Sequence, residues 1–553
     1  MARSELTFDY VIVGGGSAGC VVAAELSADP SVRVLVLEHG DDARAHPETL
    51  HADGYKDAFI NDSLIHERFS SHEARWGSRR LFMGSGRGLG GSGSINGMVY
   101  TRGSRLDYEE WPSAWRWERL VPHFEAIERT LRVRPRPATT FSEICVDAAE
   151  AVGFRRSADL NDGDLSRVLG YETMSYEGDD RRSSYVAFLA PVLDRPNLTV
   201  ITNASVERLL VTEDGVRGAL FVQDGARQTA KATREVIMTA GALETPRILM
   251  LSGIGPGQAL RRVGLPAIFD VPGVGQNLHD HPNVCVFYRG TGEVDFKYPM
   301  LYGFDRANET SALPQGMSDT CYVFYPARSS LKEMMMRIVP ALVLPPTLYE
   351  QEPLKRGIRG AIGGLFSVPQ VTRFVEGVYG IVVILGKPKS RGALTLEAAD
   401  PRTPARIDPG YFADPEDMDT MVHGIARARQ IAGAAPLAAF GNQELSPGPF
   451  GGSREALERW VRLNVMTTYH YAGTCAMGED EASVTDPELK VRGVPGLRIA
   501  DASAVPVTPV SAMNAPSMLV GHRAAQLVLE EHHGRSSTSS RSRSAAGGRA
   551  LEG

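Results

Sequence analysis

Three glycines near the start of the chain have the spacing of a phosphate-binding turn. Gly14, Gly16 and Gly19 form a G-x-G-x-x-G pattern within FDYVIVGGGSAGCVVAAEL. The first glycine permits a sharp turn, the second lets backbone approach a pyrophosphate, and the third allows a helix to pack closely on a strand. Glu38 follows about 20 residues later, where a carboxylate can accept hydrogen bonds from ribose hydroxyls and would repel a 2′-phosphate. These residue types and spacings predict a dinucleotide site, for either FAD or NAD.

The residues that flank the glycines indicate the elements that would position them. Residues 8–13 are an apolar, β-rich run, and residues 18–26 have the composition of a helix. A second apolar run, residues 32–37, ends at Glu38. The N-terminus of the helix would offer unpaired backbone N–H groups to phosphate oxygens. A strand, a turn, a helix and a second strand in this order favour a dinucleotide site over a turn that merely packs closely.

The size and composition of the chain are typical of a globular enzyme with two domains. Its 553 residues exceed what one hydrophobic core usually holds. The formal charge of −7 argues against nucleic-acid binding. No window approaches the roughly 18 apolar residues of a membrane-spanning helix, and the first residues lack a signal-peptide pattern. Five scattered cysteines without a C-x-x-C motif indicate reduced thiols, so we expect a cytoplasmic protein with no membrane span.

A second glycine-rich segment occupies residues 83–96, with the sequence MGSGRGLGGSGSIN. Consecutive glycines cost backbone entropy, which is tolerable where main chain must lie against a ligand. A flexible linker is the alternative interpretation. Leu89 and Ile95 interrupt the segment, however, and linkers seldom need apolar residues. We therefore expect a second ligand-contacting loop.

The glycine segments and several later ones resemble the glucose–methanol–choline (GMC) oxidoreductases, which are FAD enzymes that act mostly on alcohols. The resemblance extends from Phe8 to about Leu529 and implies FAD rather than NAD. Its motifs, in order, are the first glycine pattern with Glu38, GRGLGGSGSIN followed by DYEEW, TAGALETPRILMLSGIGP at 239–256, VGQNLHDHP at 274–282, TYHYAGTCAMG at 468–478 and LRIADASAVPVTPVSAMNAPSMLV at 497–520.

The resemblance implies which residues hold FAD. It places Asn96 near the flavin ring, and Asp501 and Ala502 beside the ribityl–pyrophosphate part. A packed strand end is the alternative at each position. The residues expected to contact FAD are Gly14, Gly16, Ser17, Ala18, Gly19, Glu38, Gly90, Gly91, Ser92, Asn96, Gly97, Met98, Val206, Ala240, Asp501, Ala502, Asn514 and Ala515.

One position departs from the pattern of some family members. Those members tether FAD covalently through a histidine at the position that matches Ile95. An isoleucine offers no nucleophile, so we expect non-covalent FAD.

The resemblance places the chemistry near the C-terminal end, where His470 and Asn514 match the family's histidine and its His-or-Asn partner facing the flavin. Prior transfer of a proton from a hydroxyl of pKa about 15.7 to an imidazole of pKa about 6.5 would cost roughly 12 kcal/mol. A turnover of about 1–10³ per second allows a total barrier of roughly 13–17 kcal/mol. His470 is therefore expected to accept the proton in concert with hydride departure, while the Asn514 amide stabilises the developing alkoxide. A buried structural imidazole is the alternative for His470.

The motifs imply a discontinuous α/β (α+β) fold. A Rossmann-type FAD-binding domain would comprise residues 1–158, 195–288 and 459–533, and a substrate domain built on an antiparallel sheet would comprise 159–194 and 289–458. Residues 534–553, rich in Ser, Gly and Arg, are predicted to form a disordered tail.

Local patterns predict some of the elements within these domains. Short β runs within 198–239 are separated by Asp-Gly turns, which predicts a small antiparallel sheet. Residues 380–385 and 393–396 are expected to pair as strands, and residues 417–432 to form a helix. Residues 290–375 match no pattern, and we expect them to shape the substrate pocket.

The expected function is FAD-dependent oxidation of an alcohol, preferably a primary one, to a carbonyl. Electrons would pass to oxygen or to a quinone-like acceptor, as in an alcohol oxidase or dehydrogenase. Two alternatives stay open, namely a lyase of the same fold that uses His470 for acid–base cleavage, and a flavin-bound module without turnover. His279 and His281 form an H-x-H pair, but no third ligand with suitable spacing is visible, so we expect no metal site.

Overall fold

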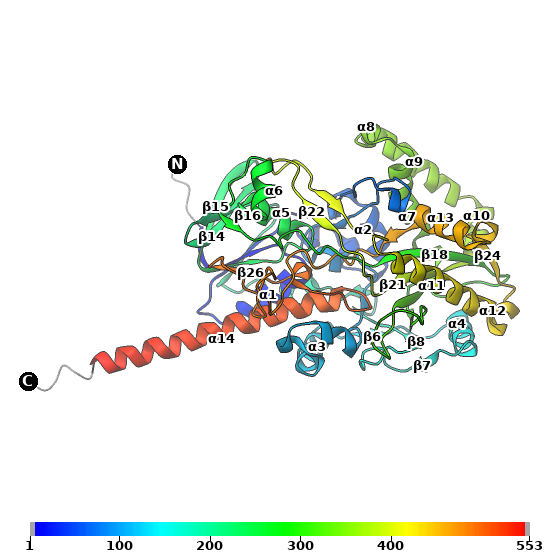
Figure 1. Ribbon diagram of the computed structural model, residues 1–553, viewed down its shortest axis with the longest axis horizontal. Coiled ribbons are helices and arrows are strands. Elements are labelled where there is room, and N and C mark those ends of the chain that lie inside the picture. The colour runs from blue at the N-terminus through cyan, green and yellow to red at the C-terminus, as the bar shows by residue number, and fades with distance from the viewer. Residues whose placement is uncertain (1–5, 548–553) are drawn as a thin grey trace, which may run out of the picture.

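Two β-sheets organise the chain in the computed structural model, which describes residues 6–547. Figure 1 shows the first sheet, with β14, β15 and β26, at one end of the molecule and the second, with β18, β21 and β24, toward the other. The mixed α/β architecture expected from the sequence is confirmed, and it rests on these two sheets.

The first sheet has seven strands. Both predicted strands belong to it, and the predicted turn and helix connect them. Its order is β12-β2-β1-β15-β14-β13, with β26 also paired to β15. The strands β12, β2, β1, β15 and β26 are parallel, and all four residues of β2 are buried, as in a sheet covered on both faces. Its strands are β1 (Leu6–Val13), β2 (Val34–Leu37), β12 (Leu198–Ile201), β13 (Ser205–Thr212), β14 (Gly215–Gln223), β15 (Ala226–Met238) and β26 (Leu497–Ile499).

The predicted hairpins of this region are β13, β14 and β15, which run antiparallel. The turn between β14 and β15 has Asp224 at φ 50° and Gly225 at φ 74°, the left-handed conformations of a two-residue hairpin loop. They do not form a separate small sheet, however. The 13-residue strand β15 is long enough to pair with β14 from Ala226 to Lys231 and with β1 from Ala230 to Met238, so hairpins and parallel strands share one sheet.

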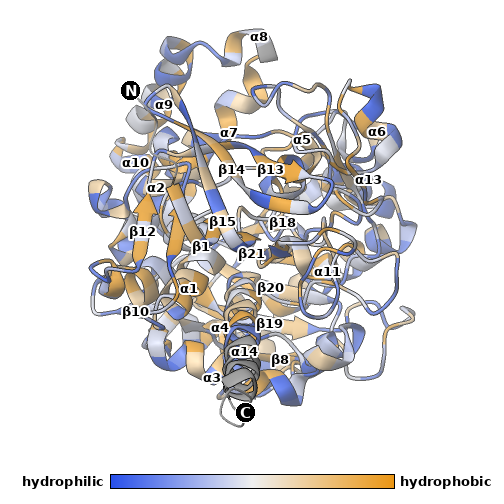
Figure 2. Ribbon diagram, turned by 90° about the vertical axis from the view of Figure 1, so that its left-hand side faces the viewer, coloured by the Kyte–Doolittle hydropathy of each residue, from blue (hydrophilic) through white to orange (hydrophobic). Residues whose placement is uncertain are grey.

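Two helices bring their N-termini together beside this sheet, α1 (Ser17–Leu26) and α14 (Asn514–Gly547). Their close crossing depends on Gly521, where an added Cβ would lie 2.8 Å from the Ala18 carbonyl oxygen. Figure 1 shows α14 running along the lower side of the molecule and beyond it, and Figure 2 shows the same helix end-on.

The second sheet has eight strands in the order β24-β18-β21-β20-β19-β8-β7, with β25 also paired to β18. All neighbours are antiparallel except β7 and β8. Three strands, β7, β25 and most of β18, come from ranges that the predicted division assigns to the FAD domain, so sheet membership and predicted boundaries differ there. The strands are β7 (Arg155–Ser157), β8 (Val168–Tyr171), β18 (Pro282–Arg289), β19 (Leu301–Asp305), β20 (Thr320–Pro326), β21 (Val378–Leu385), β24 (Gln443–Ser446) and β25 (Met466–Thr467).

The predicted pairing of residues 380–385 with 393–396 is wrong. Strand β21 is hydrogen-bonded on both edges, to β18 and to β20, so it has no free edge for another strand. The following segment instead forms β22 (Ala393–Thr395), which pairs with β23 (Arg406–Asp408).

The remaining helices surround the two sheets, and α11 confirms the helix predicted at 417–432. Residues 290–375, which matched no pattern, form β19, β20 and four helices, α7 to α10. The helices are α2 (Tyr55–Ile60), α3 (Trp117–Leu131), α4 (Thr140–Ala151), α5 (Glu244–Leu251), α6 (Gly257–Arg262), α7 (Ala327–Val343), α8 (Pro346–Tyr349), α9 (Glu352–Phe366), α10 (Pro369–Glu376), α11 (Pro415–Gly433), α12 (Ala435–Ala439) and α13 (Arg454–Asn464). Short strands make small additional ladders: β3 (Ile65–His66), β4 (Ser85–Gly86), β5 (Val99–Tyr100), β6 (Arg134–Pro135), β9 (Thr173–Met174), β10 (Tyr176–Glu177), β11 (Asp180–Arg181), β16 (Ile254–Gly255) and β17 (Phe269–Asp270).

The predicted tail differs from the structure over residues 534–547, where α14 continues as helix to Gly547. A helix that is already formed gains one backbone hydrogen bond with each added residue, and no proline interrupts this stretch. The rest of the predicted tail, 548–553, lies outside the described residues. Within residues 6–547, no helix combines the length and apolar character that crossing a membrane requires. All five cysteines are free thiols.

Candidate active site

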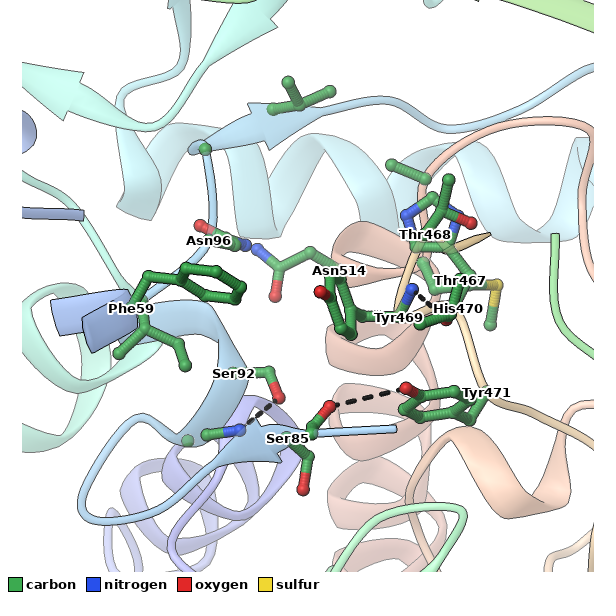
Figure 3. A pocket seen from close by; sticks show the side chains of 18 of the residues that line it. Phe59, Ser85, Ser92, Asn96, Thr467, Thr468, Tyr469, His470, Tyr471 and Asn514 are labelled. Atoms are coloured by element: carbon green, nitrogen blue, oxygen red, sulfur yellow. Dashed lines mark hydrogen bonds between the residues drawn. The ribbon is translucent and has the colours of Figure 1, made fainter. Parts of the chain in front are cut away.

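A cavity of about 520 Å³ lies between segments of both sheets, within the range of cofactor and substrate sites. Its walls come from the two glycine segments, from the residues after β15 and β26, from β19, β20 and β21, and from the loop that contains His470. Figure 3 looks into it and shows the side chain of Asn514 between those of Asn96 and His470. Residues from every motif region except 274–282 therefore meet at one site.

The two glycine segments form a cradle of bare backbone along one wall. The Gly90 N–H donates to the Gly15 carbonyl at 2.8 Å, which holds the segments together. A Cβ on Gly91 would lie 2.8 Å from the Gly16 Cα, and a Cβ on Gly14, at φ 109°, would lie 2.6 Å from the Thr239 carbonyl oxygen. Side chains are excluded at these positions, so backbone N–H groups can approach a bound phosphate.

Two helix N-termini face this cradle. Gly16 is the N-cap of α1 and supplies no capping side chain, and neither α1 nor α14 has an acidic residue in its first turn. Residues of both first turns line the cavity, among them Ser17 and Asn514. The positive ends of two helix dipoles and uncapped N–H groups favour an anion. The cavity and its donors thus fit the pyrophosphate and flavin of FAD.

The structure brings together most residues that the sequence predicted for the cofactor. Those that line the cavity are Gly16, Ser17, Ala18, Gly91, Ser92, Asn96, Gly97, Ala240, Asp501, Ala502 and Asn514. Those outside its lining are Gly14, Gly19, Glu38, Gly90, Met98, Val206 and Ala515. Several of the latter act through packing instead: a Cβ on Gly19 would lie 2.0 Å from the Gly14 carbonyl oxygen.

Glu38 has backbone partners in the structure. One carboxylate oxygen accepts from the Gly15 N–H at 2.7 Å, and the other accepts from the N–H groups of Gly40 at 2.8 Å and Gly88 at 3.0 Å. The side chain is 6% exposed. The carboxylate therefore ties the two glycine segments to the end of β2, and its predicted contact with ribose stays a prediction.

Asp501 is a buried carboxylate at the end of β26 whose oxygens are occupied by donors. It accepts from the Gly241 N–H at 2.9 Å, from the Thr245 hydroxyl at 2.6 Å and from the backbone and hydroxyl of Ser503 at 2.8 and 2.6 Å. Burial raises the pKa of Asp501, and these hydrogen bonds oppose the rise. The residue joins the segments after β15 and β26 at the cavity wall.

Arg181 is a residue near the site that the sequence did not reveal. Its guanidinium is fully buried and donates to the Gly93 carbonyl at 3.1 Å, to the Asn96 side-chain oxygen at 2.8 Å and to the Asn96 carbonyl at 2.6 Å. Burial lowers its pKa to about 9. With the Met98 N–H also donating to the Asn96 side-chain oxygen at 2.9 Å, the Asn96 amide nitrogen is left as the free end of that side chain.

His470 lines the cavity, and its backbone and ring are held by a second loop. Its N–H donates to Asp280 Oδ1 at 2.8 Å, and its Nδ1 lies 2.9 Å from Nδ1 of His281. Burial lowers the pKa of His470 to about 4, so the ring is neutral at ordinary pH. A neutral imidazole on a cavity wall can accept a proton.

Asp280 organises the loop that carries His470. Besides the two backbone N–H groups of His281 and His470, it accepts hydrogen bonds from the hydroxyls of Tyr411 and Thr467. Burial raises its pKa to about 6, and these four donors oppose the rise. The charged form is therefore the better hydrogen-bonded one, which anchors residues 467–470.

Asn514 is oriented by a residue almost 500 positions away. The hydroxyl of Ser17 donates to the Asn514 side-chain oxygen at 3.0 Å. The amide nitrogen, which carries both N–H donors, is then the end of the side chain that can reach a ligand. His470 and Asn514 thus line one cavity, and their predicted position facing the flavin stays a prediction.

Part of the cavity wall is apolar and aromatic, and most of it was not foreseen. Phe59 and Phe82 come from the region between β2 and the second glycine segment, and they pack edge-on against Tyr469 with ring centroids 6.2 and 6.4 Å away. Tyr469 adopts φ 63° and is 39% exposed, with the cavity on its open side. Met334 on α7 also lines the cavity, so the region 290–375 does shape the pocket. No sequence spacing marks these residues, because only packing unites them.

Comparisons with known proteins agree with this geometry. The family model described as GMC oxidoreductase matches residues 8–283 in its N-terminal part and 388–521 in its C-terminal part. An alcohol dehydrogenase [acceptor] from Pseudomonas putida is 32% identical over 557 residues, covering 95% of this chain and 96% of the relative. Choline oxidase from Arthrobacter globiformis is 31% identical, covering 98% of each chain. Formate oxidase from Aspergillus oryzae RIB40 superposes with a TM-score of 0.81 at 25% identity, covering 96% of this chain and 100% of the other.

Proposed function

This chain belongs to the GMC oxidoreductase family, and on that premise we propose that it oxidises an alcohol to a carbonyl with His470 as the base. The supporting observation is that His470 and Asn514 share one cavity with a glycine cradle and two helix N-termini. The cradle residues Gly16, Gly91 and Ala240 and the first turn of α1 would hold FAD. Bound FAD supplies the acceptor for the hydride that leaves the alcohol carbon.

The protein's own part in the reaction is to move one proton and stabilise one oxygen. The alcohol hydroxyl gives its proton to Nε2 of His470 while its carbon loses a hydride, which converts CH–OH to C=O. The Asn514 amide nitrogen donates to the oxygen as negative charge develops there. The apolar walls exclude water and strengthen both interactions.

The free-energy cost of proton transfer, compared with the total barrier, indicates how the proton moves. With the pKa of His470 at about 4, prior transfer from a hydroxyl of pKa about 15.7 would cost roughly 16 kcal/mol. That is nearly the whole barrier of roughly 13–17 kcal/mol for a turnover of about 1–10³ per second. Proton and hydride transfer must therefore be concerted, or the alkoxide must be strongly stabilised.

The pH profile should show two separate steps. Above about pH 7, kcat/KM should be constant, because a neutral His470 is available. It should fall modestly below about pH 6 as Asp280 is protonated and weakens its hold on residues 467–470, and then tenfold per pH unit below about pH 4 as His470 is protonated. Measurement of kcat/KM from pH 3.5 to 9 checks this, and Asp280→Asn should remove the first step. A tenfold fall per unit starting at pH 6.5 would contradict the lowered pKa of His470.

FAD is expected to be non-covalent. Ile95 lines the cavity and has no nucleophilic atom to form a bond with the cofactor. Acid precipitation should release the yellow colour into the supernatant, and the protein should keep its unmodified mass. A yellow pellet would show that this expectation is wrong.

The substrate class and the electron acceptor are also part of the proposal. A primary alcohol is the preferred substrate, since one imidazole and one amide suit an unbranched carbinol, and electrons pass on to oxygen or a quinone-like acceptor. The cytoplasmic location and the two-domain boundaries likewise stay predictions. Screening a panel of alcohols with peroxide detection, in parallel with an artificial dye acceptor, would identify the substrate and separate an oxidase from a dehydrogenase.

The oxidation state of the flavin after substrate is added distinguishes the lyase alternative. Addition of the active alcohol without oxygen should bleach the flavin absorbance if this chain is an oxidoreductase, because the electrons stay on the cofactor. A lyase would leave the flavin oxidised while consuming its substrate, and a module without turnover would do neither.

A further inference from the structure

His281, the second histidine of the H-x-H pair, lies directly against the ring of His470. We propose that His281 is a positioning residue that accepts a hydrogen bond from Nδ1 of His470 and so keeps the lone pair of Nε2 directed to the cavity. This inference rests on the proposed role of His470 as base. It concerns a residue that does not line the cavity and lies 189 positions from the one it orients.

The geometry of the two rings requires that one of the two facing nitrogens carries a proton and the other does not. Their Nδ1 atoms are 2.9 Å apart, and the rings are nearly perpendicular, with centroids 5.1 Å apart. Two protonated nitrogens at this distance would clash, and two unprotonated ones would repel each other. One Nδ1 therefore donates and the other accepts.

Only one direction of this hydrogen bond suits a base. If His281 donated, Nδ1 of His470 would be the acceptor and its Nε2 would carry the proton, leaving no lone pair for the hydroxyl of the alcohol. If His470 donates, its Nε2 is free. The same direction also serves the protonated ring that follows proton transfer, since Nδ1–H is present in both states and His281 need not change.

The other contacts of His281 are compatible with this direction. Its Nε2 lies 3.0 Å from the Thr508 hydroxyl, which can accept the remaining ring proton. His281 is fully buried, and burial, His470, His279 and Lys387 lower its pKa well below the ordinary value. The ring thus stays neutral and keeps one acceptor nitrogen.

Asp280 fixes the distance between the two rings, because its Oδ1 accepts from the backbone N–H of both His281 and His470, each at 2.8 Å. The charged and titratable groups that face this pair are Asp280, His279, Lys387, Tyr411 and Tyr471. A neutral acceptor at His281 has a consequence for the base. It orients His470 as a carboxylate would, without the negative charge that would raise the pKa of His470.

The test compares three variants of the full chain with FAD bound. His281→Ala removes the acceptor, and His281→Asn keeps an acceptor oxygen near the position of Nδ1. His279→Ala is the matched control, because His279 is equally buried in the same loop but bonds to Asn277 and the Thr508 backbone rather than to His470. The readouts are the ¹⁵N NMR signals of ¹⁵N-histidine-labelled protein, which report the tautomer of each ring, and kcat and KM with the most active alcohol of the panel. The His470 signals are identified by their loss in His470→Gln.

The native protein should show His470 protonated at Nδ1 and unprotonated at Nε2. His281→Ala should give a mixture of tautomers and lower kcat about 10–100-fold, the usual cost of removing a group that orients a functional imidazole, with KM changed less than about threefold. His281→Asn should recover most of the loss, and His279→Ala should leave the His470 tautomer unchanged. Native His470 protonated at Nε2, or an unchanged tautomer in His281→Ala, would overturn the inference. If His281→Ala fails to fold, the native spectrum and His281→Asn still decide. The NMR result does not depend on turnover, whereas a fully active His470→Ala would defeat the proposed function itself.

Discussion

His470→Ala is expected to lower kcat about 10³–10⁴-fold while FAD stays bound. A positioned general base contributes about 10²–10⁴-fold, and here no second group is placed to replace it. The ionisable side chains hydrogen-bonded to His470 are the buried Asp280, which is occupied by four donors, and His281, which does not line the cavity. Stopped-flow measurement of anaerobic flavin bleaching isolates the reductive step from the later reaction with the acceptor.

Two controls accompany this variant. The flavin absorbance and the melting temperature of His470→Ala should remain close to native, since the glycine segments proposed to hold FAD are separate in the chain from the loop that carries His470. His423→Ala, an exposed position on α11 bonded to its own helix, should be indistinguishable from native. Bleaching by His470→Ala within tenfold of the native rate would rule out His470 as the base.

Asn514→Ala is expected to lower kcat about 10²–10³-fold, the usual effect of removing one donor to a developing oxyanion. The amide nitrogen is the donor, because Ser17 occupies the side-chain oxygen at 3.0 Å. Asn514→Asp has the same shape but places an acceptor and a negative charge beside the forming alkoxide, so its loss should exceed that of Asn514→Ala. The rate of anaerobic flavin bleaching measures both.

Ser17→Ala separates orientation from donation in this pair. It leaves the Asn514 donor present but free to rotate, so kcat should fall less than in Asn514→Ala, and adding Ser17→Ala to Asn514→Ala should cost little more. Fully additive losses in the double variant would show that Ser17 acts independently of Asn514. Binding of FAD, titrated by protein fluorescence, must be checked for each variant because both residues line the cavity.

The amino-acid sequence by itself determined the local elements of the cofactor site. The strand, turn and helix around Gly14, Gly16 and Gly19 and the Asp224–Gly225 hairpin follow from residue types within a few positions of one another. Conformational preferences of this kind act over one turn or one loop, so they can be read directly. The resemblance to a family then supplied His470 and Asn514, which local pattern alone leaves as an ordinary histidine and asparagine.

Only the tertiary structure decided which distant residues touch. Ser17 and Asn514 are 497 positions apart, and His281 and His470 are 189 apart. The H-x-H pair was visible in the sequence, yet nothing along the chain showed that His281 contacts the histidine of another loop, His470. Likewise, residues 380–385 had the composition of a strand, but their partners were set by which sheet edges were already occupied. Such contacts depend on the packing of whole elements, and no spacing along the chain records which elements pack together.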